Sequence, residues 1–393
     1  MSRSDEGQEG QFRGYRRDDG RVGIRNLVLV MSITGLTCPA TRRIGSMVRN
    51  THTICMPYNT GLLGQDKAVH LRTLEGLACN PNVGAVLLIS DHVPKLEKMA
   101  AALRNRGQKV ACLSMDDVGQ DAIALVARGT RLAARLVREI SGQPRSDAGL
   151  SELRIGLKCG RSDPSSGLVA NPAVGGYIDR HVAAGGTAIF GEVVEWLGAE
   201  HLLAERAADD DIARQLLELP RDREARAVQA GLDLLGNNPS PTNIRSGIST
   251  IEEKSLGGIS KTGSQPVSGV LAYGEAPARP GLFAMDTPNY APEHLTALSA
   301  AGCQLHLFTT GAGNSFTSGL CPTLKISAND AVCAQLTEQI DIPLDGVMSG
   351  RRSMEEATGQ IYDSVRQTAD GKLSWGEILN EGDDIVSRFD AAL

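Results

Sequence analysis

The feature that most constrains the fold is an alternation of short, fully apolar runs with longer segments of helical periodicity. Three apolar runs of strand length occupy residues 26–33, 85–90 and 110–114. Each is followed by a segment with helical spacing of its apolar residues, at residues 40–49, 95–106 and 116–140. Strands that alternate with helices are typical of a parallel sheet covered by helices. Because the runs are apolar throughout, we expect both faces of the sheet to be buried.

The alternation resumes after residues 141–149, which contain Gly, Ser and Pro and which we interpret as a linker. We expect strands at residues 153–157, 186–193 and 304–309, and helices at residues 172–184, 198–208, 222–234, 291–301 and 354–367. Residues 237–268 are rich in Asn, Pro, Ser and Gly, so we interpret them as an ordered functional loop. The sequence therefore predicts an α/β protein with two parallel-sheet-containing domains, residues 13–142 and 150–393, after a disordered tail at residues 1–12.

Charge and composition exclude two classes of partner. The 393-residue chain has a formal net charge of −6, and aromatic residues make up only 4% of it, so we expect no nucleic-acid binding. The longest apolar stretch, residues 27–33, is far shorter than the roughly 20 residues of a membrane span, and residues 1–11 are polar. Eight scattered cysteines without a CxxC pair indicate reduced thiols. We therefore expect a cytoplasmic protein with no membrane contact.

The loop that begins at Cys159 follows a predicted strand and combines several reactive groups. Asp163 adds a carboxylate, Ser162 and Ser166 add hydroxyls, and Asn171 lies just beyond. Ligands of open α/β sheets bind at the carboxyl ends of strands, and backbone N–H groups before a helix can hold an anion. The alternative is that Asp163 or one of the serines only begins the following helix.

Two further loops carry groups suited to an anion. Thr309, Thr310 and Gly311 begin a glycine-rich loop after a predicted strand, which could form a nest of backbone N–H groups, or only a tight turn with positive φ. Lys254 and Lys261 lie seven residues apart and could hold a carboxylate, or one could act as a base. The alternative for both lysines is a solvated surface.

Acidic and histidine residues add further candidates. Glu192 and Glu195 come at the end of a predicted strand and could bind a metal or exchange protons, or could begin a helix. His92 follows a buried strand and is more suggestive than His201, which lies on a predicted helix. From the residues alone, the sequence indicates an α/β enzyme that acts on a small anion.

Several segments, taken in order, resemble the altronate/galactarate dehydratase family. They are residues 14–26 (GYRRDDGRVGIRN), 80–86 (NPNVGAV), 159–175, 198–201 (GAEH), 238–241 (NPSP), 254–257 (KSLG) and 308–311 (FTTG). Each segment alone is weak, but their shared order from about residue 12 to about residue 385 makes the resemblance specific.

The resemblance implies a lyase. Members of the family remove water from sugar acids such as altronate or galactarate, and a close branch, sulfolactate sulfo-lyase, removes sulfite. The family's enzymes depend on iron, so Fe²⁺ is the implied cofactor. Its dehydratases usually carry a small N-terminal domain, which the sulfo-lyase branch supplies as a separate small subunit. The resemblance therefore implies a large subunit with a small partner subunit, and we expect a homo-oligomer.

The family's reaction suggests roles for the candidate residues. Elimination beside a carboxylate needs a base for the α-proton and positive charge for the developing enediolate. The candidate catalytic residues are Asp163, Lys254, Lys261, Glu192 and His92, and the candidate iron ligand is Cys159. The candidate substrate-binding residues are Arg21, Arg25, Arg161, Ser162, Ser166, Asn171, Thr309, Thr310 and Gly311.

This sequence departs from the family at the expected metal site. The family's His-x-x-Gly-Cys run corresponds to Met56, Asn59 and Thr60, and the cysteine of its Gly-Leu-Gly-Cys-Glu turn corresponds to Val93. Cys38 and Cys159 are the expected cysteines that remain. Valine cannot bind a metal, and a threonine is a poor ligand beside a thiolate, although His92 could partly substitute.

Two more departures exchange charge at the candidate loops. Arg161 replaces a glycine of the family's Cys-Gly-Gly-Ser-Asp loop, and Ala312 replaces the arginine of Thr-Gly-Arg-Gly. The first hypothesis is a hydro-lyase that acts on a sugar acid or similar 2-hydroxy carboxylate. The alternatives are a carbon–sulfur lyase that acts on sulfolactate, a metal-independent enzyme that uses Arg161 and the lysines, and a non-catalytic sugar-acid-binding homologue.

Overall fold

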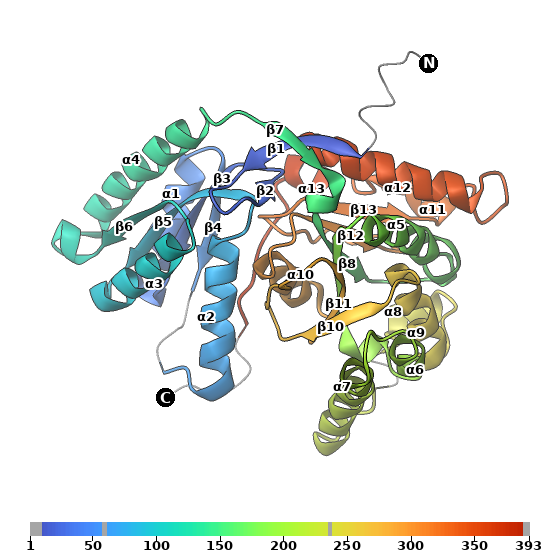
Figure 1. Cartoon of the computed structure of the whole chain (residues 1–393). Helices are drawn as coiled ribbons and strands as arrows, with labels where there is room; N and C mark the ends of the chain where they lie inside the picture. Colours follow the sequence, from blue (N-terminus) through green and yellow to red (C-terminus); the bar gives the residue numbers. More distant parts are fainter. Residues whose placement is uncertain (1–9, 57–60, 235–237, 388–393) are drawn as a thin grey trace, which may run out of the picture.

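The computed structural model describes residues 10–56, 61–234 and 238–387 of the chain. Within them, two parallel sheets lie side by side, each covered by helices, and a small antiparallel sheet lies near the top of the view in Figure 1. The predicted fold class, an α/β protein with two parallel sheets and helices packed on them, is confirmed.

The four-stranded sheet has the order β4-β3-β5-β6, and all its strands are parallel. Its strands are β3 (Leu27–Ser32), β4 (Thr51–Cys55), β5 (Val83–Ser90) and β6 (Val110–Ser114). Its helices are α1 (Cys38–Met47), α2 (Gly64–Ala78), α3 (Val93–Asn105) and α4 (Ala122–Ile140).

Both faces of this sheet are buried, as the apolar runs predict. Successive residues of a strand point to opposite faces. Val28 and Val30 of β3 pack with Ile44 of α1, whereas Leu29 and Met31 pack in a second core with residues of α2 and α3. An apolar residue is therefore needed at each of the positions 28–31 of the strand.

The seven-stranded sheet has the order β10-β11-β9-β8-β12-β13-β14, again fully parallel. Its strands are β8 (Arg154–Cys159), β9 (Thr187–Phe190), β10 (Val267–Leu271), β11 (Gly281–Met285), β12 (Leu305–Thr309), β13 (Thr323–Ser327) and β14 (Ile342–Pro343). Because all strands run the same way, their carboxyl ends share one edge of the sheet.

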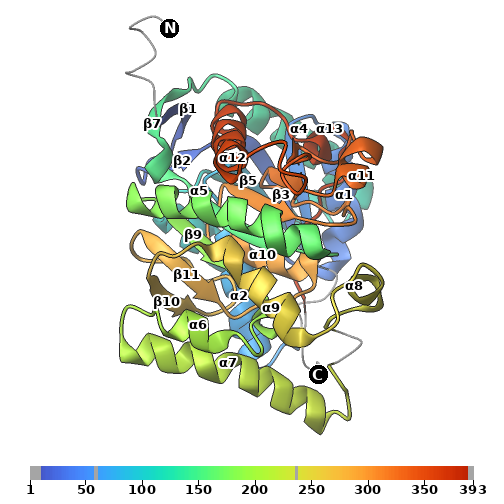
Figure 2. The same cartoon turned by 90° about the vertical axis from the view of Figure 1, so that its right-hand side faces the viewer.

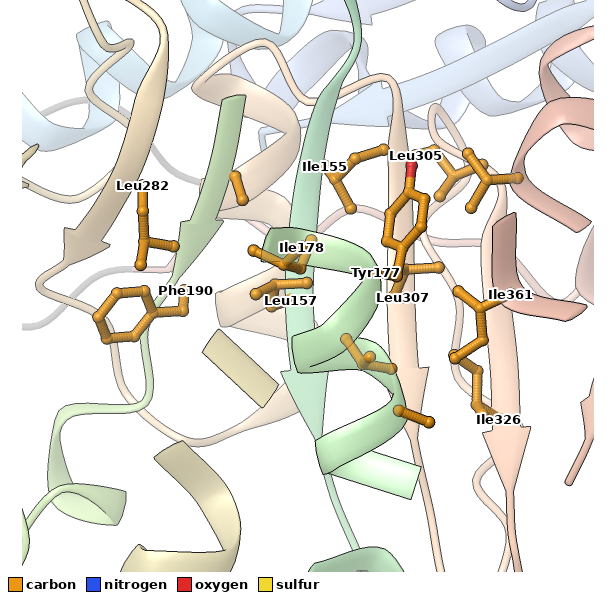
Figure 3. Close-up of a cluster of buried hydrophobic side chains, with 14 of the residues drawn as sticks. Ile155, Leu157, Tyr177, Ile178, Phe190, Leu282, Leu305, Leu307, Ile326 and Ile361 are labelled. Carbon is orange, nitrogen blue, oxygen red and sulfur yellow. The ribbon is translucent and has the colours of Figure 1, made fainter. Parts of the chain in front are cut away.

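Helices cover both faces of the seven-stranded sheet. On one face, α5 (Asn171–Ala183) and α12 (Met354–Ala369) pack against residues of β8 and β12, as Figure 2 shows from the side of these helices. Figure 3 shows Tyr177 and Ile178 of α5 lying over Leu157 and Leu307. On the other face, α10 (Ala291–Ala300) packs in a separate core with Phe283 and Phe308.

Residues 237–268, predicted as a loop, are largely helical where the structure describes them. They contain α8 (Pro241–Arg245), α9 (Ile251–Ile259) and the 3₁₀ turn η6 (Ser260–Thr262), and β10 begins in their last residues. Ser240 and Thr250 cap the two helices. The prediction was wrong because these capping residues and the glycines of α9 were interpreted as loop residues.

Two further predicted helices differ in their bounds from the helices of the structure. The helix predicted at 222–234 is α7 (Asp210–Gln229), which begins at the cap Asp209 and continues through Pro220. Pro220 was the misleading signal, since proline usually interrupts a helix interior. The helix predicted at 198–208 is shorter, as α6 (Glu200–Ala204). The remaining helices are α11 (Asp330–Gln335) and α13 (Trp375–Ile378).

The predicted linker and tail both contribute to the small sheet. β1 (Gln11–Arg16) pairs with β2 (Val22–Gly23) and with β7 (Ser146–Gly149), all antiparallel. Residues 141–149 therefore end in a strand, and the predicted tail loses Gln11 and Phe12 to β1. Phe12 is 2% exposed, and its burial supplies the reason for the pairing. Residues 1–9 lie outside the described part of the chain. None of the described helices is both long enough and apolar enough to span a membrane.

Candidate active site

Buried charged side chains gather at the carboxyl edge of the seven-stranded sheet, where the strand order changes direction beside β8. β9 lies on one side of β8 and β12 on the other. Such a position is where open parallel sheets bind ligands. Cys159 is the last residue of β8, Glu192 follows β9, and Thr309 ends β12. Lys254 and Lys261 reach the same place from α9 and η6.

Three ammonium groups and two carboxylates surround the thiol of Cys159. We call the six residues, Lys158, Cys159, Glu192, Glu195, Lys254 and Lys261, the lysine–glutamate cluster. Its side chains are no more than 7% exposed. The charges of the cluster are therefore largely removed from solvent, so the loss of any one partner would leave a buried charge uncompensated.

The contacts within the lysine–glutamate cluster are direct. Lys158 pairs with Oε1 of Glu192, and Lys261 Nζ lies 3.2 Å from Oε2 of the same carboxylate. Lys261 Nζ also lies 3.2 Å from the sulfur of Cys159, which lies 3.0 Å from Oε2 of Glu195. Lys254 Nζ lies 2.5 Å from Oε1 of Glu195. The two carboxylates are thus shared among three lysines.

Local backbone geometry aims Glu192 into the cluster. Its φ is 68°, in the left-handed region that few residues other than glycine adopt, and its N–H donates to the hydroxyl of Thr287 at 2.9 Å. The backbone N–H of Cys159 donates to Oε2 of Glu192 at 3.1 Å. A non-glycine residue held in this conformation is typical of functional sites.

A close approach of two glycines brings α9 to the cluster. A Cβ on Gly257 would lie only 3.1 Å from the Cα of Gly167, which belongs to the π-helical turn η4 (Ser166–Ala170) before α5. The absence of side chains at both positions lets α9 rest on this turn. Lys254, one helical turn before Gly257, is then held against Glu195 and the carbonyl oxygen of the Asn238 side chain.

Burial and neighbouring charges shift the pKa of three members of the cluster, Cys159, Glu195 and Lys261. Burial, with the two glutamates, raises the pKa of Cys159 to about 12, so its thiol is protonated and donates to Glu195. Burial opposes the charge of Glu195, but Lys254, Lys158 and Lys261 outweigh it and lower its pKa to about 2. Burial also opposes the charge of Lys261, yet the neighbouring sulfur and carboxylates raise its pKa. Three ammonium groups against two carboxylates leave one positive charge in excess.

A pocket of about 480 Å³ opens onto this excess charge. Its wall contains Lys158, Glu195 and Lys254 of the cluster together with Arg161. Asn289, Asn314 and Ser240 supply neutral polar groups. A second pocket, of about 330 Å³, lies on the other side of Lys254, along Ser162, Asp163 and Asn171. The geometry therefore offers an anion a cationic, hydrogen-bonding wall.

Cys159, Glu192 and Glu195 form a possible metal-binding group, because one ligand atom of each lies within 4.8 Å of the others. Each of these atoms or carboxylates, however, already contacts an ammonium group. A divalent cation placed among them would lie beside three positive charges in a desolvated site, which Coulomb repulsion strongly disfavours. The group as arranged does not fit the iron that the resemblance implies.

Several predicted site residues contact the loops around the lysine–glutamate cluster and not the cluster itself. Asp163 accepts hydrogen bonds from the hydroxyls of Ser165 and Ser166, the backbone N–H of Ser166 and the side chain of Asn329. These are the contacts of a residue that begins a helix. A Cβ on Gly311 would lie 2.3 Å from the Cγ of Asp163, so this glycine is required by the close approach of the two loops.

Asn171, Thr309 and Arg161 join the loops around the pockets. The hydroxyl of Thr309 donates to the Asn171 side chain at 2.5 Å, and Asn171 donates to the carbonyl of Gly257 at 2.7 Å. Arg161 donates to the carbonyl of Gly313 at 3.1 Å and accepts from the N–H groups of Gly311 and Ala312. The backbone carbonyl of Ser162 accepts from Asn243, and the buried hydroxyl of Thr310 has no hydrogen-bond partner among the residues that the structure describes.

Three predicted site residues are engaged elsewhere. Arg21 pairs with Asp19, and Arg25 forms a buried pair with Glu377 at 2.5 Å and donates to backbone carbonyls. His92 caps α3, accepting from the N–H of Lys95. The structure does not bring these side chains to the lysine–glutamate cluster. Among the family departures, Val93 begins α3 and Met56 is buried, whereas Asn59 and Thr60 lie outside the described residues.

Sequence reasoning missed Lys158, and it considered Glu195 as a possible metal ligand or proton-exchanging group without including it among the candidate catalytic residues. The one signal for Lys158 is a lysine that follows the apolar residues 155–157 inside the strand RIGLKC, since a charged residue in a buried strand needs a partner. Asn238, which orients Lys254, was quoted only as part of a segment. Nothing in the spacing of these residues shows that the chain brings them together.

Comparison with known proteins identifies two matching family models. The model described as "D-galactarate/Altronate dehydratase, C-terminal" matches residues 150–391, and "D-galactarate dehydratase/Altronate hydrolase, second domain" matches residues 14–141. Together they cover both parallel sheets.

Individual relatives extend over most of the chain. The (2R)-sulfolactate sulfo-lyase subunit beta of Chromohalobacter salexigens is 36% identical over 381 residues, which are 96% of this chain and 97% of that protein. The altronate dehydratase of Bacillus subtilis is 35% identical over 81% of this chain and 65% of its own length. The altronate dehydratase of Escherichia coli is 31% identical over 92% of this chain and 74% of its own length.

Proposed function

Because the chain belongs to the D-galactarate/altronate dehydratase family, we propose that it is a lyase that eliminates water from a sugar acid or a similar 2-hydroxy carboxylate. The observation that carries the proposal is the excess positive charge of the lysine–glutamate cluster at the wall of the 480 Å³ pocket. The carboxylate of the substrate supplies the negative charge that compensates this excess.

The elimination requires that negative charge be stabilised as it develops. A base removes the proton beside the carboxylate to give an enediolate. The hydroxyl on the next carbon then takes up that proton from the base and leaves as water, and the resulting enol becomes a 2-keto acid. Arg161, which lines the pocket, holds the carboxylate, and the buried charge of Lys158 stabilises the enediolate electrostatically. Preorganised cations in a desolvated site are effective at this because they need not reorganise during the reaction.

We assign the proton transfer to Lys254. It lines both pockets, and it belongs to a cluster that has one ammonium group more than it has carboxylates. Loss of a proton from Lys254 therefore brings the summed charge of the cluster to zero. Glu195 and Asn238 hold the amine in place, which makes them positioning residues. Glu195 itself is a weak base, because its pKa is lowered to about 2.

The experiment is a turnover assay of the purified chain with altronate, galactarate and other sugar acids, with and without added iron(II). Formation of a 2-keto acid is the expected result. Failure of the chain to convert any of these acids, alone or together with a small partner subunit, would overturn the proposal in favour of a non-catalytic binding protein.

A second candidate is a carbon–sulfur lyase that acts on sulfolactate together with a small partner subunit. The specific observation in its favour is that the relative named (2R)-sulfolactate sulfo-lyase subunit beta matches this chain over 97% of its length, whereas the altronate dehydratases extend further. The lysine–glutamate cluster suits this reaction equally, because the elimination of sulfite also requires removal of a proton beside a carboxylate. Release of sulfite from (2R)-sulfolactate, without 2-keto acid formation from sugar acids, would select this candidate.

A further inference from the structure

A further buried lysine, Lys325, lies behind the candidate active site, on the same face of the seven-stranded sheet as Lys158. In the parallel register, Phe308 of β12 lies opposite Lys158 of β8 on one side and opposite Lys325 of β13 on the other. Residues opposite each other in neighbouring strands point to the same face. The three side chains therefore form a row across β8, β12 and β13, near the carboxyl ends of these strands.

The ring of Phe308 contacts both ammonium groups of this row. Lys325 Nζ lies 4.3 Å from the ring centroid and Lys158 Nζ lies 5.7 Å from it, both within the range of cation–π attraction. The two lysines are each 2% exposed, and the ring is completely buried. Two positive charges thus share one aromatic ring in a desolvated core.

The two lysines differ in how their charge is compensated. Lys158 contacts the carboxylate of Glu192 and the carbonyls of Cys159 and Asn289. Lys325 donates to the carbonyl of Phe316, and in the described residues no carboxylate lies within ion-pair distance of its Nζ. A neutral donor would satisfy the Phe316 carbonyl at a much lower desolvation cost. The charge of Lys325 therefore calls for a reason beyond this hydrogen bond.

The position of Phe316 supplies that reason. Phe316 and Asn314 line the 480 Å³ pocket opposite the cluster lysines, and the N–H of Phe316 donates to the Asn314 side chain. We propose that Lys325 is a positioning residue of the active site, which holds the Phe316 wall of the pocket and adds a second buried positive charge behind Lys158. The proposal rests on the proposed function, because it concerns the same anion.

The surroundings of Lys325 make its charge sensitive to pH. Burial lowers its pKa to about 7, Asp341 and Glu381 act in the opposite direction, and Lys158 reinforces the lowering. Burial lowers the pKa of His306 on β12 to about 3, and the charge of Lys325 acts in the same direction. Burial raises the pKa of Asp341 to about 6. As pH rises through about 7, Lys325 loses its charge, so binding of an anion should weaken.

The test compares the wild type with Lys325→Met, Lys325→Arg and the exposed control Lys98→Met. Binding of altronate, galactarate and (2R)-sulfolactate is measured by calorimetry from pH 6 to 8.5, with KM in place of the binding constant for any acid that is turned over. A buried unit charge behind the pocket wall, at an effective dielectric constant of about 20, changes the affinity for an anion by on the order of tenfold. We expect about a tenfold loss in the wild type across this range, a pH-independent weak affinity in Lys325→Met, and a weaker pH dependence in Lys325→Arg, with kcat little changed.

A measurement without any ligand separates the possible failures. The folded lysine is neutral between about pH 7 and its ordinary pKa of about 10.4, where the unfolded chain binds a proton, so the free energy of unfolding should rise with pH in this window. Lys325→Met should lack this rise. If Lys325→Met keeps the wild-type affinity and pH dependence while turnover persists, the inference fails alone. If the wild type binds none of the three acids, the proposed function fails and the inference with it.

Discussion

The carboxyl edges of the two parallel sheets are built in opposite ways. At the four-stranded sheet, the buried polar side chains are neutral: Ser32 Oγ lies 3.1 Å from Thr37 Oγ1, and Thr34 Oγ1 lies 3.4 Å from Ser90 Oγ. At the seven-stranded sheet, the lysine–glutamate cluster occupies the corresponding edge. One edge is closed by hydroxyls, and the other by charges.

The difference shows which of the two sheet edges can bind and transform an anion. Hydroxyls donate and accept, so they satisfy each other and create little field. Lysines and carboxylates satisfy each other only in equal number, and here three face two, which leaves a net charge for a ligand. The replacement of an expected cysteine by Val93 falls at the neutral edge, at the start of α3. Loss of a thiol there leaves the charged edge untouched.

The largest expected effect is on turnover. Lys254→Met removes the group that we assign to proton transfer, so kcat/KM should fall by roughly 10²–10⁴-fold. The measurement is a steady-state assay with the acid that the wild type converts. Lys98→Met, an exposed lysine beside the four-stranded sheet, is the matched control and should be silent. If Lys254→Met retains more than a tenth of the wild-type value, the proton passes through another group.

The next effect is on stability at the charged edge. Glu192→Gln leaves Lys158 and Lys261, each only 2% exposed, without their shared carboxylate. Breaking a buried pair on one side costs about 3–5 kcal/mol, so the free energy of unfolding should fall by that amount. Denaturant titration followed by circular dichroism measures it. A loss below about 1 kcal/mol would show that water reaches the cluster.

The corresponding change at the neutral edge should be smaller. Ser32→Ala removes a hydroxyl that donates to the carbonyl of Thr34 at 2.6 Å and meets Thr37. A neutral hydrogen bond contributes about 1 kcal/mol, so the same denaturant titration should show a loss of that size. Turnover should not change. A stability loss as large as that of Glu192→Gln would remove the contrast between the two edges.

The smallest expected effect is that of metal removal. Because ammonium groups already contact the ligand atoms of Cys159, Glu192 and Glu195, dialysis against a strong chelator should leave both the melting temperature and the turnover unchanged. Elemental analysis of the protein before dialysis is the control. Stoichiometric iron that is lost together with activity would show that a metal displaces the lysines.

The predicted elements succeeded where burial demanded a single pattern. β3 and β5 follow largely apolar runs because each is covered on both faces, and β6, β8 and β12 overlap the other predicted strands. The strands β11 and β13 were missed, since five-residue runs without clear turn signals resemble buried helix segments. The helix α2 was missed because its buried residues include His70, Thr73 and Gly76, which blur the apolar stripe.

The sequence by itself determined the family, the α/β class and the loops in which reactive side chains occur. Those properties depend on local order along the chain: apolar runs, helical periodicity and motifs in a fixed sequence. Only the tertiary structure decided that Lys158, Glu195 and Lys261 meet at Cys159, whereas Arg21, Arg25 and His92 are engaged elsewhere. The reason is physical. The excess charge of the cluster depends on which ammonium groups share which carboxylates, and those pairs join strands and helices far apart in the sequence.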